Sequence, residues 1–187
     1  MRKHITTTLL LILLSAASCL YAASAPKAKA DGINRTYYYT AMLYGNIKVD
    51  SIAVHKAERE LQAFSNGQLV KIYRVCLGQN PVGPKQVNGD KKTPEGLYRI
   101  SYRNAGSLYH KSLAISYPNK QDVERAKKMG ESAGGDVMIH GLPNFDAEAG
   151  PDKYTNDWTW GCIALRNHEI DELFERVKPG TPILIMP

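Results

Sequence analysis

The sequence has little cysteine and none of the cysteine or histidine spacings typical of a zinc site. It contains three cysteines in 187 residues, Cys19, Cys76 and Cys162, with no Cys-x-x-Cys and no His-Glu-x-x-His pattern. We therefore predict no bound metal. An oxidising compartment could pair Cys76 with Cys162. Because Cys76 stands between apolar neighbours, we instead expect it to face the core.

The sequence also lacks a basic surface large enough to follow a nucleic-acid backbone. Its formal net charge is +6, but residues 1–30 hold four basic residues and no acidic one. The rest of the chain carries 20 basic and 18 acidic residues, a net charge of +2. Lys and Arg do not cluster among aromatic residues. We therefore expect no nucleic-acid partner.

No hydrophobic run is long enough to form a stable membrane span. The apolar run Leu9–Leu14 follows Arg2 and Lys3 and precedes small residues at 15–18. This order is typical of a secretory signal peptide, which we place at residues 1–25. A retained N-terminal anchor is the alternative, and Cys19 leaves lipidation open. We expect an exported protein, periplasmic or associated with the cell envelope, with no stable transmembrane span after signal cleavage.

The pattern of the remaining chain is that of short strands. Residues 26–46 lack an apolar period and predict a linker or N-terminal extension, and residues 47–187 predict the folded, catalytic domain. Apolar and polar residues alternate over 52–64 and 69–77, with Asn66-Gly67 between them, which predicts a hairpin. A long ordered loop is expected over 78–96. Further strands are expected over 97–101, 113–117, 137–140 and 183–186.

Two short helices are expected beside these strands. Asp122 is suited to cap a helix over 123–129, and Asn167 is suited to cap a second one with apolar residues on one face. The helices do not alternate regularly with the strands, so a parallel doubly wound sheet is not indicated. The fold class predicted is mixed β or α+β, a β-rich domain with one or two short helices packed on it.

Two segments carry the residues suited to covalent chemistry. Met138–Gly141 places His140-Gly141 at the end of an apolar run, and Trp158–Ile163 contains Gly161-Cys162. Cysteine catalysis needs a thiol, a base that removes its proton and N–H donors for the oxyanion. We predict Cys162 as nucleophile, His140 as general base and acid, and the Gly141 carbonyl as the group that orients the imidazole. The backbone at Gly161 is predicted to contribute to the oxyanion site.

These segments resemble the L,D-transpeptidase catalytic domain, the YkuD family, whose signature is His-Gly followed by Ser/Thr-x-Gly-Cys. The matching residues are His140-Gly141 and Thr159-Trp160-Gly161-Cys162. Residues 78–85 with 89–98, and residues 113–119, are also similar to family members. The resemblance covers about residues 47–187.

The resemblance implies a β-rich L,D-transpeptidase-like domain that acts on peptidoglycan stem peptides and needs no cofactor. In the family, the cysteine attacks the carbonyl of the third stem residue, releases D-Ala and leaves a thioester. An amine from a neighbouring stem then takes the acyl group. By position, Cys162 would be the nucleophile and His140 the base. Whether a lipoprotein serves as acceptor is unknown from the sequence.

Two positions depart from the family pattern. Trp160 stands where many members have His, and Ala164 where many have Arg. Arg166 is the candidate to replace that arginine in binding a substrate carboxylate. Trp160, Thr159, Arg166 and Tyr117 are the predicted substrate-binding residues. Because of these departures, an L,D-carboxypeptidase or an amidase remains an alternative, as does a wall-binding module that has lost catalysis.

Overall fold

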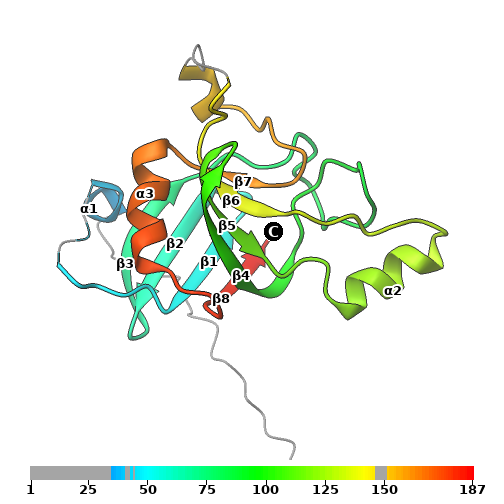
Figure 1. Cartoon of the computed structure of the whole chain (residues 1–187), viewed down its shortest axis with the longest axis horizontal. Helices are drawn as coiled ribbons and strands as arrows, with labels where there is room; N and C mark the ends of the chain where they lie inside the picture. The colour runs from blue at the N-terminus through cyan, green and yellow to red at the C-terminus, as the bar shows by residue number, and fades with distance from the viewer. Residues whose placement is uncertain (1–34, 41–42, 44, 146–150) are drawn as a thin grey trace, which may run out of the picture.

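The computed structural model describes residues 35–40, 43, 45–145 and 151–187 (Figure 1). The predicted signal peptide, residues 1–25, and the first part of the predicted linker lie outside these residues. Among the residues that are described, no helix is both long and apolar enough to cross a membrane. One short helix, α1 (Arg35–Thr40), falls within the segment predicted as linker or extension and lies beside the edge strand β3.

The described residues form one eight-stranded sheet in the order β3-β2-β1-β8-β4-β5-β6-β7. β1 pairs in parallel with β8, and β6 pairs in parallel with β7, whereas the other neighbours are antiparallel. The strands are β1 (Ser51–His55), β2 (Glu60–Ser65), β3 (Gln68–Arg74), β4 (Gly96–Ser107), β5 (His110–Ile115), β6 (Met138–His140), β7 (Ile163–Ala164) and β8 (Pro182–Met186). This architecture confirms the β-rich fold class.

β4 joins the two halves of the sheet. Residues 96–99 pair with β8, while residues 100–107 pair with β5, and the register shifts at two places along this second half. Irregular register bends a strand and increases its twist. The second half of β4 and β5 therefore form a hairpin that rises from the sheet, drawn in green in Figure 1.

The hairpin predicted at Asn66-Gly67 is confirmed between β2 and β3. Both residues have positive φ, +51° and +75°, as a two-residue hairpin turn requires. The alternating run over 52–64 is two strands and not one, because the chain turns at 56–59, where Arg59 also has positive φ. Lys56 at this turn is buried and pairs with Glu95 at 2.7 Å.

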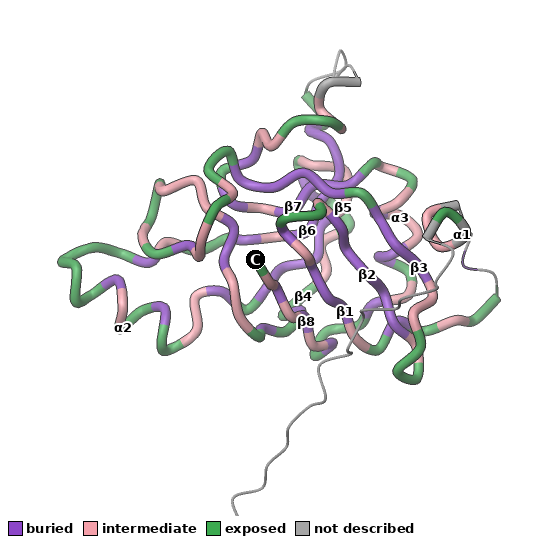
Figure 2. Tube along the Cα trace, turned by 180° about the vertical axis from the view of Figure 1, so that it is seen from behind, coloured by how far each residue is buried: buried purple, intermediate pink, exposed green. Residues whose placement is uncertain are grey.

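Both predicted helices exist, but the capping residues differ from the prediction. α2 spans Lys120–Lys128 and its N-cap is Asn119, whose side chain accepts hydrogen bonds from the N–H groups of Gln121 and Asp122. Asp122 is the third helical residue: it accepts the Asn119 N–H at 3.0 Å and the Tyr98 hydroxyl at 3.0 Å. α2 projects from the sheet and is mostly exposed (Figure 2).

The second helix, α3 (Asn167–Arg176), begins one residue after its N-cap, Arg166. Asn167 does not cap it, because the Asn167 side chain instead accepts the Leu142 N–H at 2.8 Å. A 3₁₀ turn, η1 (Pro151–Tyr154), precedes the loop that leads to β7. α3 packs its apolar face, formed by Ile170, Leu173 and Phe174, against the sheet. Cys76 is buried at 5% exposure, as predicted.

The corrected cap of α2 leads to a stability prediction. Asn119→Ala removes a partly exposed cap and is expected to cost about 1 kcal/mol of unfolding free energy. Asp122→Ala removes a buried carboxylate that also pairs with Arg125, and is expected to cost about 3 kcal/mol. Urea unfolding of the two variants measures both losses. Equal losses, or a larger loss for Asn119→Ala, would contradict this description of the helix.

Candidate active site

The parallel pairing of β6 with β7 places His140 and Cys162 on the same face of the sheet. His140 is opposite Ala164, and Ile139 is opposite Ile163. Side chains alternate between the two faces along a strand. Ile139 and Ile163 therefore point into the core, where both are fully buried, while His140 and the residue two before Ala164, Cys162, point to the other side.

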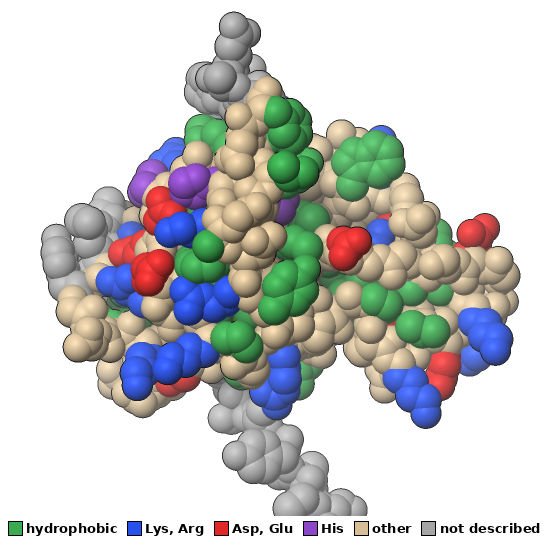
Figure 3. Space-filling model, in the orientation of Figure 1, with side chains coloured by type: hydrophobic (Ala, Val, Ile, Leu, Met, Phe, Trp, Pro, Cys, Tyr) green, Lys and Arg blue, Asp and Glu red, His purple; other side chains and the backbone are tan. Residues whose placement is uncertain are grey.

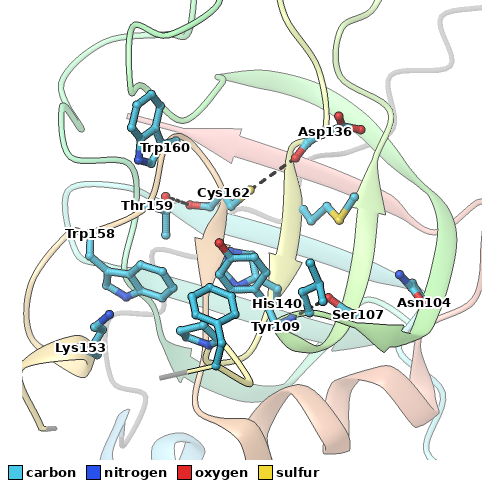
Figure 4. Close-up of a pocket in the computed structure, with 14 residues that line it drawn as sticks. Asn104, Ser107, Tyr109, Asp136, His140, Lys153, Trp158, Thr159, Trp160 and Cys162 are labelled. Atoms are coloured by element: carbon cyan, nitrogen blue, oxygen red, sulfur yellow. Dashed lines mark hydrogen bonds between the residues drawn. The ribbon is translucent and has the colours of Figure 1, made fainter. Parts of the chain in front are cut away.

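His140 and Cys162 line one pocket of about 510 Å³ (Figure 4). Its walls come from the β4–β5 hairpin, the segment before β6, and the loop from η1 to β7. Figure 3 shows hydrophobic side chains gathered on this face near β6 and β7. The pocket is lined by Asn104, Ser107, Leu108, Tyr109, Asp136, Met138, His140, Pro143, Phe145, Lys153, Trp158, Thr159, Trp160 and Cys162.

The imidazole of His140 is held in one orientation. Its Nδ1 lies 2.7 Å from the Gly141 carbonyl oxygen, which can only accept a hydrogen bond. Nδ1 therefore carries the proton, and Nε2 has the free lone pair. The ring packs against Tyr109 and Trp158, with ring centroids 4.6 and 5.6 Å away. Burial lowers the pKa of His140, and the hydrogen bond to Gly141 partly opposes this.

Gly141 has a steric reason to be glycine. A Cβ at this position would lie 2.6 Å from Oδ1 of Asn167 and 3.0 Å from Cβ of His110. The Gly141 N–H also donates to the Tyr109 carbonyl at 3.0 Å. The turn that carries the His140 acceptor is thus fixed by the β4–β5 hairpin and by the start of α3.

The thiol of Cys162 is half-buried, and its Sγ lies 3.5 Å from the Asp136 carbonyl oxygen. Burial raises the pKa of Cys162, and the Asp136 carboxylate raises it further. A backbone hydrogen bond from Met138 and the charge of Lys85 act in the opposite direction. Both shifts favour the neutral forms, a protonated thiol and an uncharged imidazole.

The backbone before Cys162 is fixed by Thr159. The Thr159 hydroxyl donates to the Cys162 carbonyl at 2.7 Å and accepts the Gly161 N–H at 3.1 Å. Gly161 has a φ of +128°, and a Cβ there would lie 2.6 Å from the Lys92 carbonyl oxygen. The Gly161 N–H, which we predicted as an oxyanion donor, donates to the Thr159 hydroxyl in this structure. Glycine is required here by conformation and close packing.

The predicted substrate-binding residues have different locations. Thr159 is buried within the loop that leads to β7 and lines the pocket. Trp160 lies at the pocket rim and is 69% exposed, and Lys91 Nζ lies 5.0 Å from its ring centroid. Arg166 is outside this pocket. It borders a separate depression on the far side of the loop from η1 to β7, and its guanidinium lies 5.3 Å from the Tyr154 ring centroid.

Tyr117 is also outside the Cys162 pocket. It is buried, and its hydroxyl donates to the Ala133 carbonyl at 2.9 Å. Tyr117 thus anchors the segment that precedes β6 and presents no polar group to the pocket. Neither Arg166 nor Tyr117 lines the Cys162 pocket, but Tyr117 lines a second depression that shares Asp136 and Met138 with it.

Sequence reasoning missed most of the pocket walls. Ser107, Leu108 and Tyr109 come from the tip of the β4–β5 hairpin, and Lys153 comes from η1. Lys153 Nζ lies 5.2 Å from the Trp158 ring centroid, at the pocket's edge. Nothing in the local sequence marks these residues, because they reach the pocket only through the bend of β4 and the path of the loop before β7.

Comparison with known proteins agrees with this arrangement. The L,D-transpeptidase catalytic domain family (YkuD) matches residues 50–185. The protein named "Putative L,D-transpeptidase YafK" of Escherichia coli K12 is 31% identical over 149 residues, which cover 73% of this chain and 53% of the relative. The chain thus spans about half the length of that relative.

Solved structures of similar fold include two with sequence identity above one quarter. A variant of the helical cell shape determining protein Pgp2 from Campylobacter jejuni superposes with a TM-score of 0.54 at 26% identity, over 76% of this chain and 48% of that one. Bd1075 of Bdellovibrio bacteriovorus superposes with a TM-score of 0.53 at 29% identity, over 75% of this chain and 48% of that one. Because the family match extends over most of the chain and includes both strands of the site, the chain belongs to the L,D-transpeptidase catalytic domain (YkuD) family.

Proposed function

We propose that this protein is an exported cysteine peptidoglycan L,D-transpeptidase. It transfers the acyl group of a tetrapeptide stem to an amine acceptor through a thioester on Cys162, with release of D-Ala. The observation that supports this most directly is the shared pocket of Cys162 and His140, in which the Gly141 carbonyl orients the imidazole. Action on the wall requires export, in agreement with the predicted signal at residues 1–25.

The proposed reaction begins from a neutral pair. As Cys162 Sγ attacks the carbonyl carbon of the third stem residue, its proton passes to His140 Nε2. The imidazolium formed keeps its Nδ1 hydrogen bond to the Gly141 carbonyl. The tetrahedral intermediate then collapses, the C–N bond to D-Ala breaks, and His140 gives its proton to the leaving amine. Cys162 is left as a thioester.

The second half of the reaction uses the same groups. The acceptor amine attacks the thioester carbonyl and loses a proton to His140, which returns it to the departing Cys162 sulfur. Because the Gly161 N–H donates to Thr159, we propose the Cys162 N–H as the oxyanion donor. The Thr159 hydroxyl holds the two peptide groups that flank this N–H, because it accepts the Gly161 N–H and donates to the Cys162 carbonyl.

Hydrolysis of the same thioester by water is the second candidate, giving an L,D-carboxypeptidase or an amidase. The position of Arg166 favours it, since the arginine expected to bind a substrate carboxylate borders another depression. The likeness to a cell shape determining protein accords with either trimming or crosslinking of the wall. A module that binds the wall without catalysis is the third.

Incubation of the protein with disaccharide-tetrapeptide, followed by mass spectrometry, separates these candidates. We expect loss of D-Ala, a thioester adduct on Cys162 and crosslinked dimers. Free disaccharide-tripeptide without dimers would indicate hydrolysis. Unchanged substrate with retained binding would indicate the silent module.

In the same assay, Cys162→Ala is expected to abolish turnover and His140→Ala to lower it by about 10²–10⁴-fold. Cys76→Ala is the matched control, because burial raises the pKa of Cys76 to about 11 and this thiol does not line the pocket. Inactivation by Cys76→Ala in a folded protein would contradict the assignment of the nucleophile.

The pH dependence follows from the two pKa shifts. Since burial raises the pKa of Cys162, alkylation of this thiol is expected to rise with pH through a midpoint above the ordinary value for cysteine. Since burial lowers the pKa of His140, the base stays neutral into mild acid, so kcat/KM is expected to fall only below the ordinary imidazole pKa. Rates of iodoacetamide labelling in a background with Cys19→Ala and Cys76→Ala measure the first midpoint. A thiol that titrates below neutral pH would show a preformed ion pair instead.

Thr159 gives a further prediction. Thr159→Val keeps the shape but removes both hydrogen bonds that hold the loop, so kcat/KM is expected to fall by about tenfold or more as the Cys162 peptide shifts. The lost bonds are expected to cost about 1–3 kcal/mol of stability. Thr159→Ser keeps the hydroxyl and is expected to retain most activity. Full activity of the valine variant would show that this loop does not position the oxyanion donor.

A further inference from the structure

Lys85 is a buried cation beneath the loop that carries Cys162. Its side chain is 4% exposed, and Nζ donates to Asp90 Oδ1 at 2.8 Å and to the Val87 carbonyl at 3.1 Å. Burial of an ammonium group is costly unless it is paired and hydrogen bonded. The pair lies in the long loop over 78–96, outside the pocket lining. The proposed reaction above assigns it no role.

The stem of Lys85 lies near Gly161, the residue that precedes the proposed nucleophile. The position that a Cβ on Gly161 would take lies 3.9 Å from Cδ of Lys85. The two loops are also joined through their backbones, since the Gln79 N–H donates to the Thr159 carbonyl at 3.0 Å and the Thr159 N–H donates to the Leu77 carbonyl at 3.1 Å. Lys85 is therefore held at a fixed place under Gly161-Cys162.

We propose that Lys85 is a positioning residue. Its positive charge, partly offset by the Asp90 carboxylate, stabilises the negative charge that forms at Cys162 during the attack. This inference rests on the proposed function of Cys162 as nucleophile. A fixed cation in a site that excludes water acts more strongly on a thiolate and on the adjacent oxyanion than a solvated one.

The charged groups around Cys162 are few. The Lys85 charge lowers the pKa of this thiol, whereas the Asp136 carboxylate raises it. His140 and Lys153 line the same pocket, and Lys91 lies over Trp160 at the rim. Among these, Lys85 is the buried cation packed on the backbone of the nucleophile loop.

A purely structural role for the pair is the rival explanation. Asp90 also accepts hydrogen bonds from the N–H groups of Gln86, Val87 and Lys92, at 2.7, 3.2 and 3.0 Å. Loss of either partner would loosen the loop. The two explanations differ in sign: a loosened loop shifts the thiol pKa in the same direction whichever partner is lost, whereas an electric field shifts it in opposite directions.

The test measures the Cys162 thiol pKa in Lys85→Met and Asp90→Asn, each in the full chain with Cys19→Ala and Cys76→Ala, so that Cys162 is the remaining cysteine. The pKa is read from the pH dependence of iodoacetamide labelling, without substrate. We expect Lys85→Met to raise it by about half a unit or more, because Asp90 is left uncompensated, and Asp90→Asn to lower it. Any result in which the two variants do not shift in opposite directions overturns the proposal.

Three controls complete the design. Lys56→Met removes another buried lysine, which pairs with Glu95 in the same loop, and is expected to lower stability without shifting the Cys162 pKa. Lys85→Arg keeps the charge and is expected to keep the pKa near that of the parent. If Lys85→Met does not fold, the proposal requires two other results. The Cys162 pKa must fall in Asp90→Asn, and it must stay near the parent value in Lys85→Arg. Because labelling needs no turnover, failure of transpeptidation and failure of this inference are read separately.

Discussion

Parallel pairing of β6 with β7 is the contact on which the rest of the site depends. The two strands have three and two residues, and their register places the buried Ile139 and Ile163 side by side. With that register, His140 and Cys162 must lie on the opposite face, on neighbouring strands. A shift of one residue in either strand would turn His140 or Cys162 toward the core. The pairing of Ile139 with Ile163 thus determines the relative position of His140 and Cys162.

The site is rigid because backbone segments are in direct contact around it. A Cβ on Gly78 would lie 2.2 Å from the Lys91 carbonyl oxygen and 3.1 Å from Cα of Gly161. The loop over 78–96 therefore packs directly against the loop that carries Cys162, and at Gly78 no side chain larger than hydrogen fits between them. Thr159 then fixes the peptide of Cys162 through two hydrogen bonds. Backbone contacts of this kind fix the position of the Cys162 thiol.

The electrostatics of the site balance burial against fixed charges. Burial disfavours both the thiolate and the imidazolium and so favours a neutral thiol beside a neutral imidazole. In the proposed attack, positive charge forms on the His140 imidazole and negative charge on the Cys162 side. The Gly141 carbonyl stabilises the first, and the Lys85 charge, beside Asp90, is proposed to stabilise the second. The 78–96 loop, which carries the buried Lys85 and supplies Glu95 as the partner of the buried Lys56, thereby links the stability of the domain to its proposed chemistry.

The sequence by itself determined the features that depend on local chemistry. The Asn66-Gly67 turn, the β-rich class, the apolar face of α3, the burial of Cys76 and the family resemblance at His140 and Cys162 all follow from neighbouring residues. Tertiary structure alone decided where distant segments meet: it placed Arg166 outside the Cys162 pocket, joined the Asn167 side chain to the Leu142 N–H, and brought Tyr109 over His140. These outcomes depend on contacts between segments far apart in the chain, where a hydrogen-bonding group takes whichever partner the folded backbone brings near, and no local pattern encodes that choice.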